Sequence, residues 1–233
     1  MMSTGKVFCI TGIDTDIGKS VVTGLLGRYL LGRGVNAITQ KVCQTGCKGI
    51  SEDILLHRKI MGMALTDEDR QGLTCPYVFS EPCSPHLAGS LENTVIEPQR
   101  ISEATQKLAE HYDVVLLEGV GGLMVPLQVD LTLVDYLQSF SYHHFLVCSP
   151  RLGSINHTLA ALEILQRREI RLQGLIYNRF EETSEIITAD SREIIAHYLS
   201  KFGHRPKIAD VFGHDPKDDT AIPDFSTLFD AVL

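Results

Sequence analysis

Residues 12–20 read Gly12-Ile13-Asp14-Thr15-Asp16-Ile17-Gly18-Lys19-Ser20 and follow a short apolar run, Val7 to Thr11. Glycines followed by Lys-Ser, between a strand and a helix, are typical of a phosphate-binding loop. Glycine lets the backbone wrap around phosphate oxygens, the helix start presents unpaired N–H groups, and lysine adds a positive charge. Five residues separate the two glycines, one more than in the strict pattern. A chance glycine-rich turn is the alternative interpretation.

Short β-rich runs alternate with helical patterns around this phosphate-binding loop. Strands are expected at 7–11, 35–41, 114–117, 145–148, 175–177 and 208–212, and helices at 22–32, 53–61, 101–112, 155–167 and 182–199. The strand at 114–117 is expected to be central, and the prolines of 74–89 to exclude regular helix. This alternation predicts one P-loop NTPase-like α/β domain over residues 1–233, with a mostly parallel sheet and helices on both faces.

The composition is that of an ordinary globular protein. The 233 residues include 21 basic and 29 acidic ones, for a formal charge of −8. An acidic balance disfavours nucleic acid and anionic membranes as partners, and no apolar run reaches the roughly 18 residues of a membrane span. Six irregularly spaced cysteines without a signal peptide favour reduced thiols and a cytoplasmic location. Cys43 and Cys47 lack a second pair at zinc-ligand spacing.

Two further motifs are expected beside the phosphate-binding loop. Glu118-Gly119-Val120-Gly121-Gly122 follows the strand at 114–117, and Lys41 ends the strand at 35–41. Open α/β sheets bind ligands at this edge. Mg²⁺ prefers oxygen ligands, which Ser20 and Glu118 could supply, and two lysines would stabilise a phosphoryl group during transfer. The alternatives are a solvated Glu in a glycine turn and a solvated Lys at a strand end.

Taken in chain order, the motifs resemble the dethiobiotin synthetase family. The segments that carry the resemblance are Thr11 to Ser20, Lys41 with Thr45-Gly46, Glu81 to Ala88, Glu118 to Gly122 with Pro126-Leu127, and Leu152 to His157. The longer phosphate-binding loop is itself a feature of that family. The resemblance implies a homodimeric, cytoplasmic ligase of biotin biosynthesis that uses ATP and Mg²⁺. Its reaction joins CO₂ to 7,8-diaminononanoate (7,8-diaminopelargonate) and closes the ring of dethiobiotin, through a carbamate and a carbamic-phosphoric anhydride.

The resemblance also implies roles for individual residues. The catalytic residues are Lys41, Lys19 and Thr15. The nucleotide-binding residues are Asp16, Ile17, Gly18, Lys19, Ser20, Val21, Glu118, Gly119, Val120, Gly121, Asn178 and Arg179, and Asn178 matches the residue that reads adenine. The metal ligands are Ser20, Asp53 and Glu118. The substrate contacts are Thr45, Gly153, Ser154 and Asn156, of which the last three form a turn that a second subunit contributes in the family.

The sequence departs from the family pattern at two places. Val42 stands where the family usually has Pro, so we expect a looser loop after Lys41. Residues 209–215 lack the family's Pro-containing adenine loop, which leaves the nucleotide preference open. His86 receives no role.

Two other functions compete with this interpretation. One is a related amidoligase with another amine or carboxylate substrate. The other is a ParA- or MinD-like ATPase switch, which would carry a signature lysine where this chain has Ile13 and Asp14.

Overall fold

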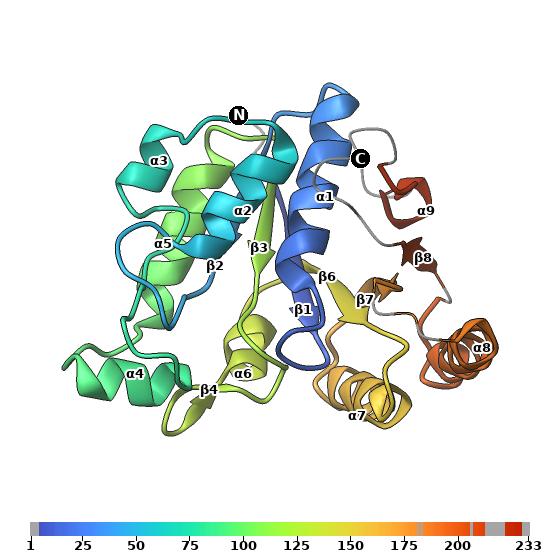
Figure 1. Cartoon of the computed structure of the whole chain (residues 1–233). Coiled ribbons are helices and arrows are strands. Elements are labelled where there is room, and N and C mark those ends of the chain that lie inside the picture. The colour runs from blue at the N-terminus through green and yellow to red at the C-terminus, as the bar shows by residue number, and fades with distance from the viewer. Residues whose placement is uncertain (1–4, 181, 183, 206, 213–221, 230–233) are drawn as a thin grey trace.

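Runs of buried aliphatic residues form one parallel sheet with the strand order β2-β3-β1-β6-β7-β8 (Figure 1). The computed structural model describes residues 5–180, 182, 184–205, 207–212 and 222–229. The strands are β1 (Lys6–Gly12), β2 (Ala37–Lys41), β3 (Val114–Glu118), β6 (His143–Cys148), β7 (Leu172–Asn178) and β8 (Ile208–Val211). Every pairing between them is parallel, which confirms the predicted fold class.

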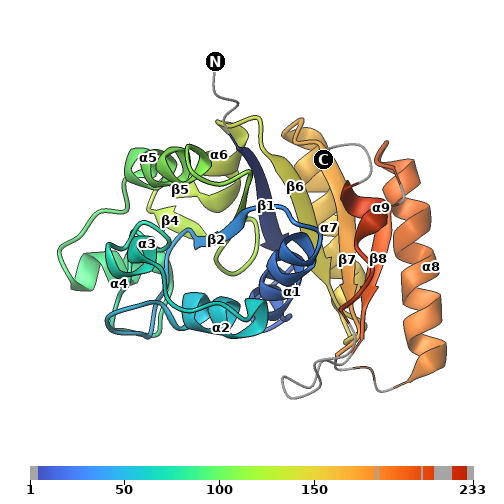
Figure 2. The same cartoon turned by 90° about the horizontal axis from the view of Figure 1, so that it is seen from above.

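Helices cover both faces of the sheet (Figure 2). The helices are α1 (Lys19–Gly32), α2 (Glu52–Met61), α3 (Asp67–Arg70), α4 (Pro85–Leu91), α5 (Pro98–Ala109), α6 (Leu133–Gln138), α7 (Ser154–Arg167), α8 (Glu185–Lys201) and α9 (Ser226–Phe229). A short hairpin of β4 (Pro126–Gln128) and β5 (Leu131–Thr132) lies apart from the main sheet. None of the helices in the described part of the chain is long and apolar enough to cross a membrane.

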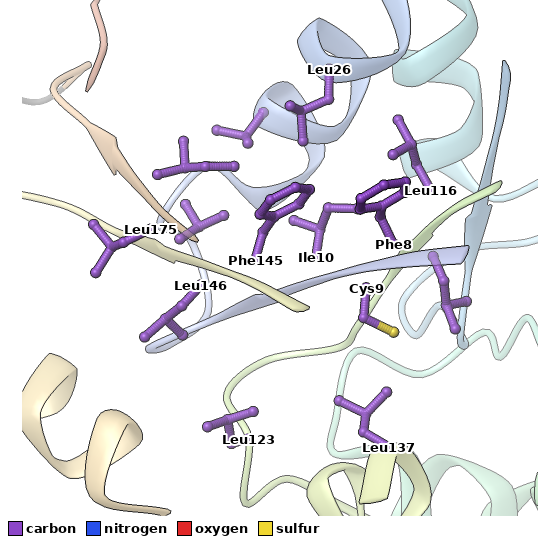
Figure 3. Packing of buried hydrophobic residues seen from close by; sticks show 14 of the residues in the cluster. Phe8, Cys9, Ile10, Leu26, Leu116, Leu123, Leu137, Phe145, Leu146 and Leu175 are labelled. Atoms are coloured by element: carbon purple, nitrogen blue, oxygen red, sulfur yellow. The ribbon is translucent and has the colours of Figure 1, made fainter. Parts of the chain in front are cut away.

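The core follows the alternation of side chains along the buried strands. Phe8 and Phe145 point to the face that carries α1 and stack with ring centroids 5.5 Å apart (Figure 3). Cys9, between Phe8 and Ile10, points to the opposite face, toward Leu137 of α6. Burial on both faces is why these strands appear in the sequence as continuous apolar runs.

Two expectations about the elements are wrong. The segment 74–89 does contain the start of a helix, because Pro85 occupies the first position of α4, where a missing N–H costs no helical hydrogen bond. β3 lies between β2 and β1, one place from the sheet edge, and the middle of the sheet is formed by β1 and β6. The apolar sequence of β3 predicted that it is buried on both faces. That pattern does not tell a strand in the middle of the sheet from one next to the edge strand.

The strand order places the phosphate-binding loop at the point where the chain changes direction across the sheet. From β1 the chain builds β2 and β3 on one side, and then β6, β7 and β8 on the other. Lys41 pairs in register with Glu118, so both side chains leave the sheet at its carboxyl edge. Ligands bind open α/β sheets at such a reversal.

Candidate active site

The phosphate-binding loop adopts backbone conformations suited to an anion. Gly18 has a φ of 83° and Asp16 a φ of 55°, both left-handed. Gly18 precedes α1, and no side chain caps the start of this helix. The N–H groups of the first helical turn therefore remain available to phosphate oxygens, and the helix dipole favours negative charge there.

The side chain of Lys19 folds back over the loop. Its Nζ donates to the carbonyl oxygen of Asp14 at 2.5 Å. Burial, and then repulsion from Lys41, lower the pKa of Lys19 to about 8. The Asp14 carboxylate forms an ion pair with Arg151, and the Ile13 N–H donates to Val147 O at 3.1 Å. The loop is therefore held by β6 and by the segment that follows it.

Lys41, Asp53, Glu118 and Ser20 form one cluster, the carboxylate cluster. Lys41 Nζ lies 2.6 Å from Asp53 Oδ2 and 2.7 Å from Glu118 Oε1. Ser20 Oγ donates to the same Glu118 Oε1 at 2.9 Å. Four side chains from β2, α2, β3 and the start of α1 thus meet in one cluster. The sequence predicted Lys41, Glu118 and Ser20 for this edge, and the family resemblance implied Asp53.

The charges of the carboxylate cluster stabilise one another. Burial alone would raise the pKa of Glu118, but the cations around it, Lys41 first, hold that pKa below its ordinary range. Burial alone would lower the pKa of Lys41, but Glu118 and Asp53 outweigh burial and raise it. A protonated Lys41 and an ionised Glu118 are the resulting forms at neutral pH.

The sequence interpretation missed His57, which belongs to this cluster. His57 Nε2 lies 2.8 Å from Glu118 Oε2, and both side chains are fully buried. Asp53 and His57 are four residues apart on α2, so they lie on the same face of that helix. That spacing was readable in the sequence once Asp53 was singled out.

A cavity of about 1000 Å³ opens beside the carboxylate cluster. This volume is at the upper end of the roughly 300–1,000 Å³ usual for small-molecule sites. The predicted residues that line it are Thr15, Asp16, Ile17, Gly18, Lys19, Ser20, Val21, Lys41, Thr45, Asp53, Glu118, Val120, Gly121 and Asn178. The structure therefore brings most of the sequence-predicted residues to one cavity. Phe180 and Phe212, which the sequence interpretation missed, line it as well.

Some predicted residues do not line this cavity. Gly119, Arg179, Gly153, Ser154 and Asn156 are absent from its wall, although all five belong to the described residues. The Arg179 guanidinium pairs with Glu182 and lies 4.7 Å from the ring centroid of Phe212, which does line the cavity. Gly153 precedes α7, and Ser154 and Asn156 belong to its first turn.

Asn178 connects β7 to the phosphate-binding loop. Its Nδ2 donates to the carbonyl oxygen of Ile17 at 2.9 Å, and its Oδ1 accepts from the Phe180 N–H at 3.3 Å. A Cβ atom on Gly18 would collide with Asn178 Nδ2. The family's adenine loop would fall at residues 209–215, and residues 213–215 of this segment lie outside the described residues.

The expectation that Val42 loosens its loop is wrong. The Val42 side chain is fully buried, and its N–H donates to Glu118 O at 2.9 Å. A proline at this position could not make that bond. The following residues are held by the segment at 77–81, with Gln44 N–H donating to Tyr77 O and Cys47 N–H to Phe79 O.

The donor set of the carboxylate cluster fits a hard divalent cation. Two carboxylates contact the Lys41 nitrogen, and the Ser20 hydroxyl contacts one of them. Mg²⁺ prefers oxygen ligands of this kind. No group of three His, Cys, Asp or Glu side chains in the described ranges could hold a metal by itself. A cation here would therefore depend on Ser20 and on the phosphates of a nucleotide.

Comparison with known proteins places the chain in a family. A model of the AAA domain family matches residues 6–218. The chain is 51% identical over 197 residues to the ATP-dependent dethiobiotin synthetase BioD 2 of Pasteurella multocida, covering 84% of this chain and 92% of that protein. It is also 51% identical over 199 residues to the ATP-dependent dethiobiotin synthetase BioD of Chlorobaculum tepidum, covering 85% and 83%.

Solved structures show a likeness of fold alone. A ParA family ATPase from Chlorobium tepidum TLS has a TM-score of 0.51 at 16% identity, covering 91% of this chain and 85% of that chain. Chloroplast FtsY from Physcomitrella patens has a TM-score of 0.53 at 16% identity, covering 99% and 66%. At 16% identity these similarities indicate a shared fold and give no information about function. The relatives that match at 51% identity over most of both chains show that this chain belongs to the dethiobiotin synthetase family.

Proposed function

We propose that this protein is an ATP-dependent dethiobiotin synthetase, which joins CO₂ to 7,8-diaminononanoate and closes the cyclic urea of dethiobiotin in biotin biosynthesis. The family membership supports the activity. The observation that carries the chemistry is the contact of 2.7 Å between Lys41 Nζ and Glu118 Oε1, at the wall of the cavity that the phosphate-binding loop also lines. Phosphoryl transfer needs cations and oxygen ligands gathered in this way.

The nucleotide would bind along the phosphate-binding loop. The N–H groups of Gly18, Lys19 and Ser20 would hold phosphate oxygens, and the Lys19 ammonium would add a mobile charge. Asn178 and the exposed rings of Phe180 and Phe212 line the same cavity, which favours them as contacts of the base.

Ser20, Asp53 and Glu118 would hold Mg²⁺ together with the phosphates. When bound, the ion would neutralise charge on the phosphate oxygens. Because Lys41 already contacts both carboxylates, the protein's own cation and the metal would share one acidic site.

The reaction would proceed by one addition and two displacements. An amine of the substrate attacks CO₂ and loses a proton, which gives a carbamate. A carbamate oxygen then attacks the γ-phosphorus and ADP leaves, which gives a carbamic-phosphoric anhydride. The second amine attacks the carbonyl carbon, inorganic phosphate leaves, and the loss of a proton completes the ring. Lys41 would stabilise the negative charge on the carbamate and the transferring phosphoryl group.

The substrate site would be completed by a second copy of the chain. Thr45 lines the cavity and would contact the diamine or carbamate. Gly153, Ser154 and Asn156 do not line the cavity of their own chain, which supports the proposal that they serve the partner's cavity in a homodimer. There the N–H groups at the start of α7 would bind the distant carboxylate of the substrate.

Coupled phosphate release tests the function. Phosphate formation from MgATP is measured with the diamine alone, bicarbonate alone and both together, with mass spectrometry of the product. We expect rapid release only with both compounds, and one dethiobiotin per phosphate. Release that needs neither compound, or that another amine supports better, would contradict the proposal and favour the ATPase switch or the amidoligase.

A further inference from the structure

We propose that His57 is a positioning residue, which fixes the Glu118 carboxylate so that one of its oxygens faces Ser20 and the nucleotide. The inference rests on the proposed metal site, because Glu118 is its buried ligand. His57 touches neither substrate nor metal in this proposal and acts through Glu118.

The two oxygens of Glu118 have different partners. Oε1 accepts from Lys41 Nζ at 2.7 Å and from Ser20 Oγ at 2.9 Å, at the wall of the cavity. Oε2 lies 2.8 Å from His57 Nε2. His57, which does not line the cavity, thus satisfies Oε2 and leaves Oε1 for the reacting groups.

The hydrogen in this contact belongs to His57. Lys41 Nζ and Ser20 Oγ both donate to Glu118 Oε1, and a carboxylate paired with an ammonium only accepts hydrogen bonds. His57 Nε2 is therefore the donor. His57 Nδ1 is buried and has no hydrogen-bond partner among the described residues, so Glu118 is the polar group to which this ring is bound.

Close packing of α2 against α1 holds the donor in place. A Cβ on Gly24 would come within 2.9 Å of Ile60 Cβ, and one on Gly27 within 2.7 Å of Met61 Sδ, so both glycines allow the two helices to approach. The helix that begins with Ser20 at its second position and the helix that carries Asp53 and His57 are thereby fixed together. His57 has no exposed surface from which water could replace its hydrogen bond.

Removing the donor would leave Glu118 Oε2 buried without a partner. A buried carboxylate oxygen in that situation rotates toward another donor or admits water, and either change moves Oε1. Partners that orient a metal ligand in this way typically contribute 10–100-fold to metal affinity. Affinity for the nucleotide without metal does not depend on the orientation of Glu118.

The test compares His57→Gln, which places an amide N–H near the position of Nε2, with His57→Leu, which removes the donor at similar volume. His144→Leu is the matched control, because His144 is also buried but lies at the start of β6, away from the cavity. Mn²⁺ binding is measured by electron paramagnetic resonance in the presence of a non-hydrolysable ATP analogue. Binding of the same analogue in EDTA is measured by calorimetry, and the Mg²⁺ dependence of kcat by phosphate release.

We expect Mn²⁺ to bind about 10–100-fold more weakly to His57→Leu. His57→Gln and His144→Leu should stay within about threefold of wild type, and binding in EDTA should be unchanged in every variant. Mn²⁺ affinity retained in His57→Leu, or lost equally in His57→Gln, would overturn the inference.

Should His57→Leu fail to fold, His57→Asn replaces it, because the same amide is then one methylene too short to reach Oε2. Equal Mn²⁺ affinity in the Asn and Gln variants would overturn the inference. Wild-type protein that binds the analogue but no Mn²⁺ would refute the proposed metal site itself, which distinguishes the two failures.

Discussion

At the scale of single residues, Lys41 is the cation shared by the acidic groups of the cavity. It lies within 2.7 Å of both Asp53 and Glu118, and its side chain is 6% exposed. A buried ammonium between two carboxylates is costly to desolvate, so it persists only with such partners. The same partners keep it charged, which is the form that stabilises a transferring phosphoryl group.

The change Lys41→Met removes this charge and keeps the aliphatic stem. We expect kcat to fall by about 10²–10³, because one contact of this kind stabilises the transition state by roughly 3–4 kcal/mol. ATP affinity should remain within about threefold, since the phosphate-binding loop supplies most of the contacts. Steady-state kinetics and calorimetry measure both quantities, and Lys48→Met, at an exposed position of the same loop, is the control. A kcat close to wild type would refute the role of Lys41.

Single residues were predictable from the sequence where a local motif places them at a strand end. Lys41 and Glu118 are examples, because parallel strands bring their carboxyl ends to one edge. His57 was not predicted, because it lies within α2 and not at a strand end, so no local motif indicates its contact with Glu118. The effect of Val42 also depended on a contact far away in sequence, with Glu118 O.

At the scale of elements, the turn from β1 into α1 owes its shape to a left-handed backbone conformation. Gly18 has a left-handed φ of 83°. Asn178 Nδ2, from β7, occupies the space that a Cβ at position 18 would need. Because Asn178 Nδ2 also donates to Ile17 O, β7 fixes the shape of the phosphate-binding loop.

The change Gly18→Ala should weaken ATP binding at least tenfold. Alanine is strained at this φ by about 1–2 kcal/mol, and its Cβ would push Asn178 Nδ2 away from the loop. Gly34→Ala is the control, because Gly34 also has a left-handed φ, 77°, but its Cβ would meet nothing within 4 Å. Calorimetric titration with ATP checks the pair. Equal losses of affinity in both variants would show that strain alone, and not the shape of the loop, is responsible.

Strand β6 carries a buried histidine that makes stability depend on pH. Burial, reinforced by the neighbouring His143, lowers the pKa of His144 from 6.5 to about 4. The unfolded chain then binds more protons than the folded one between those values, so stability falls as pH falls from 6.5 toward 4. We expect His144 to account for a loss of about 2 kcal/mol between pH 7.5 and pH 5. Urea unfolding of wild type and His144→Leu at both pH values measures it, and identical pH dependence would exclude His144 as the cause.

The existence of long elements was predictable, and short ones were not. Buried strands and amphipathic helices have repeated patterns over many residues, whereas α6 has six residues and β5 has two. The start of α6 did carry a readable signal, since Thr132 and Asp135 form a capping box. Pro85 misled the prediction because proline excludes the interior of a helix and suits its first turn.

At the scale of the whole molecule, the proposed substrate site needs two copies of the chain. Leu152, just before α7, is fully exposed, and Gly153, Ser154 and Asn156 do not line the cavity of their own chain. Leu152 is an exposed apolar residue of the kind found where two chains pack together. The start of α7 beside it presents N–H groups that could bind a carboxylate of the substrate held by the partner.

Mixing two inactive variants tests the shared site. Lys41→Met removes the phosphoryl contact, and Asn156→Asp places a carboxylate where the substrate carboxylate would bind. The mixed dimer should recover about half of wild-type activity, because one of its two sites would be intact. Recovery is measured after separation of the mixed dimer by affinity tags. A mixed dimer without activity would refute the sharing of the site.

The transfer of an oxygen atom from CO₂ to phosphate tests the central claim most directly. If a carbamate oxygen attacks the γ-phosphorus in the cavity beside Lys41 and Glu118, phosphate leaves the anhydride with that oxygen. We predict that ¹⁸O-labelled bicarbonate, added with the diamine and MgATP in unlabelled water for less time than label exchange needs, gives inorganic phosphate with one ¹⁸O atom by mass spectrometry. Unlabelled phosphate, formed together with dethiobiotin from bicarbonate that still holds its label, would contradict the account.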